Sequence, residues 1–251
     1  MNAATSLQRP VQPNFSEGCE TVNIFKTAMF CAAGLNVIAM ILSFAIPACR
    51  KNHLPAKMVC SALFITAAVF AALAYGSFTA YSALIIAALS FAFAGDFFLD
   101  WKDGKTFYTG VVCFSVCHII YIATFLFNRT PSLAGYAKQV LVGLLVLGVV
   151  SAIHIAINKI KFIGKDKALI PYCLILVTSF IVAVTRGAAA LAEGNTGYGI
   201  CLAAAGTLFL ISDGCLAALM FGKPVLPHSD QIVAYTYFPA QTLFAISILY
   251  Q

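Results

Sequence analysis

Charged residues are scarce in this sequence. Only 10% of the 251 residues are Asp, Glu, Lys or Arg, and 61% are hydrophobic, whereas soluble globular domains carry about 25% charged residues. This shortage excludes a soluble domain. The hydrophobic residues form long runs, each near the ~20 residues that a helix needs to cross the hydrocarbon core of a bilayer. The composition therefore indicates a polytopic membrane protein.

The runs also lack the alternation of polar and apolar residues that is typical of membrane β-strands. Only helices and closed barrels satisfy the backbone in lipid, so the expected fold class is all-α, with eight transmembrane helices in one bundle. We expect a poorly ordered tail over residues 1–26 and an eight-helix transmembrane domain over residues 27–251. The predicted spans are residues 27–48, 58–75, 79–99, 107–127, 139–158, 168–191, 197–221 and 231–250.

Basic residues are unevenly divided between the loops on the two sides of this bundle. The positive-inside rule places the side that is rich in Lys and Arg in the cytosol, so we expect both termini on the non-cytosolic side. Two N-x-S/T triplets, at Asn14 and Asn128, fall on that non-cytosolic side. The predicted cytosolic side has Arg50, Lys51, Lys57, Lys102, Lys105, Lys159, Lys161, Lys165, Lys167 and Lys223, against Arg9, Arg129 and Lys138 on the other.

The sequence has no concentrated basic patch and no Cys or His pairs at metal-ligand spacing. Although the net charge is +6, the basic residues lie in short loops, so no nucleic-acid partner is expected. The nine cysteines are scattered, mostly within apolar runs, which is typical of small buried residues. We expect no metal and no cofactor. A metal-dependent membrane lipid hydrolase stays open as an alternative, because His53 and His228 both lie in predicted cytosolic loops.

Four ionisable side chains lie well inside predicted spans: Asp96, His118, Arg186 and Asp213. A charged residue at a helix centre costs roughly 2.5–3.5 kcal/mol on insertion scales, so such residues are functional candidates. Asp213 lies about eight residues, or roughly 12 Å, from the cytosolic end of its span, and Asp96 is a few residues from its own end. The two carboxylates can therefore share a pocket. The structural alternatives are interhelical hydrogen bonds for the aspartates and snorkelling to the interface for Arg186.

The two aspartates belong to a series of short motifs in the third, fourth, sixth, seventh and eighth spans. Gly95 precedes Asp96, Ser212 precedes Asp213, and an Ala-Gln pair lies in the last span. In this order, the motifs resemble those of the YhhN-like lysoplasmalogenase family of eight-span membrane proteins. The resemblance is carried by residues 91–99, Gly110, Phe114, His118, Tyr121, Arg186, residues 206–213 and residues 236–241.

The resemblance implies hydrolysis of the sn-1 vinyl ether bond of lysoplasmalogens, giving a fatty aldehyde and a glycerophosphoethanolamine or glycerophosphocholine. It also implies a lysophospholipid substrate, membrane lipids as the other partners, and residence in the endoplasmic reticulum or another internal membrane. The sequence departs from the family at Asp100, where an apolar residue is more usual. We expect Asp100 and Asp103 to be solvated charges at the cytosolic edge.

Vinyl ether hydrolysis begins with protonation of the alkene carbon and passes through an oxocarbenium ion that water captures. This chemistry requires an acid and a carboxylate, and Asp96 and Asp213 are the predicted catalytic pair. Two carboxylates in a low-dielectric site repel each other, so one of them should keep its proton; which one stays open. A proton-coupled transporter and a non-catalytic role are the alternatives from other classes. The predicted residues that bind or orient the substrate are His118, Tyr121, Tyr237, Gln241 and Arg186.

Overall fold

The computed structural model describes residues 15–46, 49, 53–100, 104–127 and 133–251. This part of the chain contains α-helices and short 3-10 helices and no β-strand, so the predicted all-α class is confirmed. Its long helices are α1 (Phe15–Ala45), α3 (His53–Tyr75), α4 (Ala80–Asp100), α5 (Gly104–Phe127), α6 (Leu133–Ile157), α7 (Ile170–Ala192), α8 (Thr196–Phe221) and α9 (Ser229–Ile246), with 3-10 helices η1 (Gly164–Leu169) and η2 (Ser247–Tyr250).

Seven of the described helices are long and apolar enough to cross a membrane. The chain is therefore a multi-pass integral membrane protein. The remaining predicted span, residues 139–158, corresponds to α6, whose apolar part within the described residues is the shorter stretch Leu141–Ile157. The described residues thus contain the eight long helices that were predicted. Seven of these helices are long and apolar enough to span a membrane.

Helix α1 begins earlier than predicted. Residues 15–26 were expected to belong to a tail, but they are part of α1, and its apolar stretch starts at Glu20. The prediction was wrong there because Glu20 and Lys26 interrupt the apolar run without ending the helix; Glu and Lys are good helix formers. The rest of the predicted tail, residues 1–14, lies outside the described residues.

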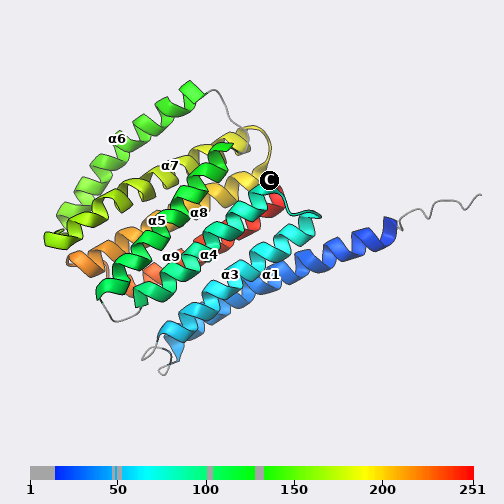
Figure 1. Cartoon of the computed structure of the whole chain (residues 1–251), viewed down its shortest axis with the longest axis horizontal. Coiled ribbons are helices and arrows are strands. Elements are labelled where there is room, and N and C mark those ends of the chain that lie inside the picture. The colour runs from blue at the N-terminus through cyan, green and yellow to red at the C-terminus, as the bar shows by residue number, and fades with distance from the viewer. Residues whose placement is uncertain (1–14, 47–48, 50–52, 101–103, 128–132) are drawn as a thin grey trace, which may run out of the picture.

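The helices form one elongated bundle in which successive helices run in alternating directions (Figure 1). Helix α1 packs on α3, α4 on α5, and both α7 and α9 on α8, while α9 also contacts α3 and α4. Helix α6 lies along the edge opposite α1 and packs against α7. Helices α3, α4, α5, α7, α8 and α9 therefore enclose the interior of the bundle.

The outer surface of the bundle is apolar. On α6, for example, Leu141, Leu145 and Val149 are each about 60% exposed or more, at 60%, 66% and 62%. They recur every four residues, so they share one face of the helix. A surface that exposes so many large apolar side chains is suited to contact with lipid.

Glycines bring the site-bearing helices close together. A Cβ atom on Gly187 of α7 would lie 2.7 Å from the carbonyl oxygen of Gly199 on α8, and one on Gly95 of α4 would lie 2.7 Å from the Phe114 ring on α5. Real Cβ atoms do not approach so closely, and small residues are common where membrane helices pack backbone to backbone. These contacts hold α7 against α8 near Arg186, and α4 against α5 beside Asp96.

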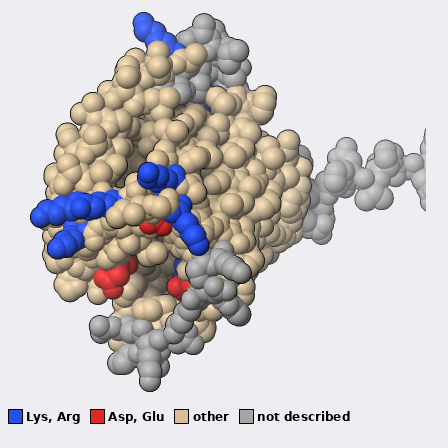
Figure 2. All heavy atoms as spheres, turned by 60° about the vertical axis from the view of Figure 1, so that its left-hand side comes forward, with Lys and Arg blue, Asp and Glu red and all other residues tan. Residues whose placement is uncertain are grey.

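Lysines gather at one end of the bundle, the left-hand end of Figure 1, which faces the reader in Figure 2 with acidic side chains among them. We call it the lysine end. It contains the start of α3, η1, and the chain that follows α6 and α8. This is the predicted cytosolic side, although Arg50, Lys51, Lys102, Arg129 and both sequon asparagines, Asn14 and Asn128, lie outside the described residues. The lysines that define the end are Lys57, Lys159, Lys161, Lys165, Lys167 and Lys223.

Candidate active site

A cavity of about 370 Å³ lies among the helices at the lysine end, within the ~300–1,000 Å³ typical of ligand pockets. Much of its wall is apolar, with Leu99, Phe107, Val111, Phe114 and Leu176 among the lining residues. The lining also includes a smaller set of polar side chains. These are Ser43, His53, Lys57, Asp96, Asp100, Tyr172, Ser212, Asp213, Asp230 and Tyr237.

Asp96 of α4 is held by donors from two other helices. Its side chain is almost fully buried, and its Oδ2 accepts hydrogen bonds from Ser61 Oγ at 2.5 Å and from Tyr237 OH at 2.8 Å. The Nζ of Lys57 lies 3.5 Å from Oδ1. Lys57 and Ser61 stand one turn apart on α3, so both face α4. Three donors therefore converge on this carboxylate, which favours its ionised form.

Asp213 of α8 has a different environment. It is partly buried, and its carboxyl accepts a hydrogen bond from the Tyr172 hydroxyl, near the start of α7. No Lys or Arg of the described chain forms an ion pair with it. Asp213 is therefore held by one neutral donor, whereas Asp96 has two neutral donors and a cation.

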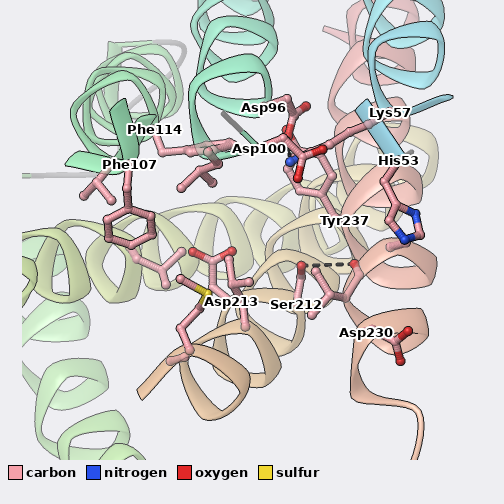
Figure 3. Close-up of a pocket in the computed structure, with 18 of the residues that line it drawn as sticks. His53, Lys57, Asp96, Asp100, Phe107, Phe114, Ser212, Asp213, Asp230 and Tyr237 are labelled. Carbon is pink, nitrogen blue, oxygen red and sulfur yellow. Dashed lines mark hydrogen bonds and ion pairs between the residues drawn. The ribbon is translucent and has the colours of Figure 1, made fainter. Parts of the chain in front are cut away.

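Asp96 and Asp213 line the same cavity, as expected from their similar depth. In the close-up, Asp96 projects from α4 on one side of the cavity and Asp213 projects from α8 on another (Figure 3). The described hydrogen bonds connect each carboxylate to its own partners and do not join the two. Both carboxyl groups therefore border the same cavity without being bonded to each other.

The predicted orienting residues occupy two different places. Tyr237 borders the cavity and donates to Asp96. Tyr121 and Gln241 do not border it; they are fully buried and bonded to each other, with Tyr121 OH 2.7 Å from Gln241 Oε1. Gln241 stands one turn beyond Tyr237 on α9, so this pair forms the polar layer behind the Asp96 site.

His118 also lies behind the cavity. It is 2% exposed, its ring is surrounded by those of Tyr121, Tyr172 and Phe209, and neither ring nitrogen has a hydrogen-bond partner among the described residues. The ring centroids of His118 and Tyr172 are 6.1 Å apart. His118 therefore packs against the tyrosine that donates to Asp213, and does not line the cavity.

Arg186 does not line the cavity. It follows Leu176, a lining residue of α7, by ten residues, which corresponds to about 15 Å along a helix. Its side chain is 3% exposed, so snorkelling to the interface is the wrong explanation. Arg186 is thus buried within the bundle, away from the residues that line the cavity, and its contact with a substrate stays a prediction.

Four residues of the cavity region were not recognised in the sequence as site residues: Lys57, Ser61, Tyr172 and Asp100. Lys57 was counted with the loop charges, although its i, i+4 spacing from Ser61 on an apolar helix indicates a shared polar face. Asp100 was expected to be solvated, and this was wrong. Helix α4 continues to Asp100, which lines the cavity with Oδ2 buried. Asp103 lies outside the described residues.

The metal alternative has no ligand set in the described part of the chain. No group of three or more His, Cys, Asp or Glu side chains there lies close enough together to hold a metal ion. His53 borders the cavity, but His228, at the start of α9, does not. Of the two histidines, His53 is thus the one that lines the cavity together with the aspartates.

Comparison with known proteins identifies the family. The model of the YhhN family matches residues 52–248, which include every helix that borders the cavity except α1. The chain belongs to the YhhN family. This confirms the resemblance seen in the motifs of the sequence. The matched residues include both the Asp96 motif and the Asp213 motif.

Two proteins that are similar to this YhhN chain carry the name of an enzyme activity. Lysoplasmalogenase TMEM86B of Sus scrofa is 31% identical over 168 residues, which cover 67% of this chain and 64% of the pig protein. Lysoplasmalogenase TMEM86B of Homo sapiens is 28% identical over 171 residues, covering 67% of this chain and 65% of the human protein. The match thus spans slightly less than two thirds of each relative. No solved structure matches the chain.

Proposed function

We propose that this YhhN-family protein is a lysoplasmalogenase, a hydrolase of the sn-1 vinyl ether bond of lysoplasmalogens that releases a fatty aldehyde and a glycerophospho-headgroup. The observation that carries the proposal is that Asp96 and Asp213, from two different helices, line one cavity with apolar walls. The activity named for the two TMEM86B relatives supports the choice of substrate.

The partners of the two aspartates suggest a division of roles. Lys57, Ser61 and Tyr237 favour an ionised Asp96. Asp213 has no cationic partner among the described residues and faces the same cavity. Since like charges in one low-dielectric site oppose double ionisation, Asp213 is the carboxyl that keeps its proton. We assign Asp213 as the general acid and Asp96 as the carboxylate that stabilises the cation.

The reaction then follows in three steps. Asp213 gives its proton to the β-carbon of the vinyl ether, and the electrons of the double bond form the new C–H bond. The resulting oxocarbenium ion is stabilised by the negative charge of Asp96. Water adds to the α-carbon and gives a proton to the Asp213 carboxylate. The hemiacetal finally breaks its bond to the glycerol oxygen: its hydroxyl loses a proton and becomes the carbonyl of the aldehyde, that proton is passed to the glycerol oxygen, and both products leave.

The cavity lining suggests how the lysolipid lies. Phe107, Phe114 and Leu176 offer an apolar wall to the alkenyl chain, and burial of a chain there is favoured by about 0.8 kcal/mol per CH₂ group. Lys57, the lysine of the cavity lining, offers a positive charge to the headgroup phosphate. Tyr237 is placed to orient the glycerol hydroxyl or water, with Tyr121, Gln241 and His118 supporting it from behind.

We further propose that α6 also crosses the membrane, which gives eight spans in all. The lysine end then lies in the cytosol and both termini lie on the non-cytosolic side. The membrane is that of the endoplasmic reticulum or another internal membrane. The gathering of lysines at one end supports this orientation. An epitope tag fused after Gln251 tests it: the tag should stay hidden from antibody in cells with only the plasma membrane permeabilised. Staining under that condition would reverse the orientation.

The deciding experiment for the activity is lysoplasmalogen turnover by purified protein, with Asp96→Asn and Asp213→Asn as variants. We expect each variant to fold and to lose about 10²–10⁴-fold in turnover, the usual contribution of an acid or base. Near-normal turnover in both variants would refute the catalytic assignment. Flux through proteoliposomes without cleavage would indicate the transporter alternative.

A further inference from the structure

Asp100 is a third carboxylate in the cavity, and no residue of the described chain forms an ion pair or a hydrogen bond with its carboxyl group. It ends α4 and stands one turn beyond Asp96 on the same face, which separates their Cβ atoms by about 5–6 Å. It lines the cavity on the side of the lysine end. Its Oδ2 is buried, and no described residue donates a hydrogen bond to it. Figure 3 shows Asp96 and Asp100 on the same side of the cavity.

The cavity lining has more acidic than basic side chains. The ionisable lining consists of four carboxyl groups, Asp96, Asp100, Asp213 and Asp230, against Lys57 and His53. The ion pair that Lys57 forms is with Asp96, and the hydrogen bond of Asp213 is with Tyr172. Asp230 is exposed to solvent. Among the described residues, Asp100 is thus a partly buried carboxylate with neither a cation nor a hydrogen-bond donor paired with it, a state that is costly unless a ligand supplies the positive charge.

We propose that Asp100 binds the primary ammonium group of an ethanolamine headgroup. This inference rests on the proposed function for the lipid itself and adds the headgroup class. A primary ammonium carries both the positive charge and the N–H donors that the buried Oδ2 lacks, whereas a quaternary ammonium supplies charge without a donor. Lys57, which borders the same cavity, gives the phosphate a cationic neighbour beside the ammonium.

Headgroup binding by stable analogues tests the proposal. Saturated 1-alkyl lysophospholipids have no vinyl ether, so binding is measured without turnover, using ethanolamine, choline and glycerol headgroups in matched detergent micelles. We expect wild-type protein to bind the ethanolamine lipid about tenfold to a hundredfold more tightly than the glycerol lipid, as for a charge-assisted hydrogen bond. The choline lipid should fall between the two.

Asp100→Asn isolates the carboxylate while keeping its shape. We expect this variant to bind all three headgroups about equally, with its affinity for the glycerol lipid unchanged. Asp166→Asn is the matched control at the lysine end: Asp166 accepts a hydrogen bond from Tyr108 and does not line the cavity. It should keep the wild-type order of affinities. Thermal unfolding in detergent verifies that both variants are folded.

Two results would overturn the inference. One is a wild-type protein that binds the three headgroups equally, which decides the matter even where Asp100→Asn does not fold. The other is a folded Asp100→Asn protein that keeps the ethanolamine preference. Because the analogues cannot be cleaved, failure of the proposed vinyl ether hydrolysis would show separately, as a wild-type protein without turnover but with an intact headgroup preference.

Discussion

Lys57 and Asp96 form an ion pair across α3 and α4, with Nζ 3.5 Å from Oδ1 and side-chain exposures of 23% and 2%. The lysine therefore reaches from the mouth of the cavity to a carboxylate inside it. Since Ser61 and Tyr237 donate to the other oxygen of Asp96, the carboxylate is fixed from both sides. This network joins α3, α4 and α9 at the cavity.

Replacing Lys57 by Met should remove the charge that stabilises Asp96. We expect kcat to fall by about tenfold to a hundredfold, or roughly 1.4–2.8 kcal/mol of barrier, because Asp96 no longer holds its charge as the cation forms. Lys57→Arg should recover most of the rate. Steady-state kinetics with a lysoplasmalogen measures both variants. A Lys57→Met enzyme with unchanged kcat would contradict the role assigned to Asp96.

Tyr172→Phe should weaken the acid function of Asp213, whose hydrogen bond from the described residues comes from Tyr172. We expect a loss of about tenfold in kcat with little change in KM, since one hydrogen bond to a carboxyl is worth roughly 1.5 kcal/mol. The control is Tyr108→Phe, which removes an equivalent hydroxyl bonded to Asp166 outside the cavity. Equal losses in the two variants would mean that the effect of Tyr172 is not specific to the site.

Tyr237 and Tyr121 offer a second comparison between equivalent groups. Tyr237→Phe removes a donor from Asp96, while Tyr121→Phe removes a donor from Gln241 behind the cavity. We expect the larger loss of turnover in Tyr237→Phe, by about tenfold relative to Tyr121→Phe, because only Tyr237 touches a proposed reacting group. The order of the two kcat values is the measurement, and the reverse order would place the chemistry deeper in the bundle.

Gly95→Ala should destabilise the bundle beside the site. The added Cβ would lie 2.7 Å from the Phe114 ring, and overpacking of this kind costs about 1–3 kcal/mol. Gly34→Ala on α1 is the control, because nothing lies within 4 Å of its added Cβ. Thermal unfolding in detergent should show a lower Tm for Gly95→Ala alone, and Phe114→Leu in the same chain should restore part of it. An unchanged Tm would mean that α4 and α5 can move apart at no cost.

Hydrophobic length predicted the helices well. The predicted span at residues 79–99 corresponds to Ala80–Asp100, and that at residues 197–221 to Thr196–Phe221. Apolar run length works because the bilayer, rather than tertiary packing, sets how long these helices must be. It failed at the ends. Helix α1 starts before its apolar run, and α4 extends one residue past its predicted span to Asp100, since helix ends depend on backbone hydrogen bonding and not on hydropathy alone.

The aspartates were predictable and their partners were not. Asp96 and Asp213 stand out because lipid penalises carboxylates. Lys57 and Tyr172 have no such signal, since a Lys or Tyr at a helix end is also an ordinary interface residue. Their role depends on which helices become neighbours, and the close approach of α7 to α8 at Gly187 and Gly199 is a property of packing. Arg186 was misjudged for the same reason.

The cavity joins an apolar wall inside the membrane to a mouth that carries Lys57 and His53. For the proposed reaction, this geometry separates the products by phase. A long-chain aldehyde partitions into hydrocarbon, and the polar glycerophospho-fragment partitions into water at the lysine end. Each product then leaves along a different route, so the two cannot readily recombine in the site, and the release of one does not have to wait for the other.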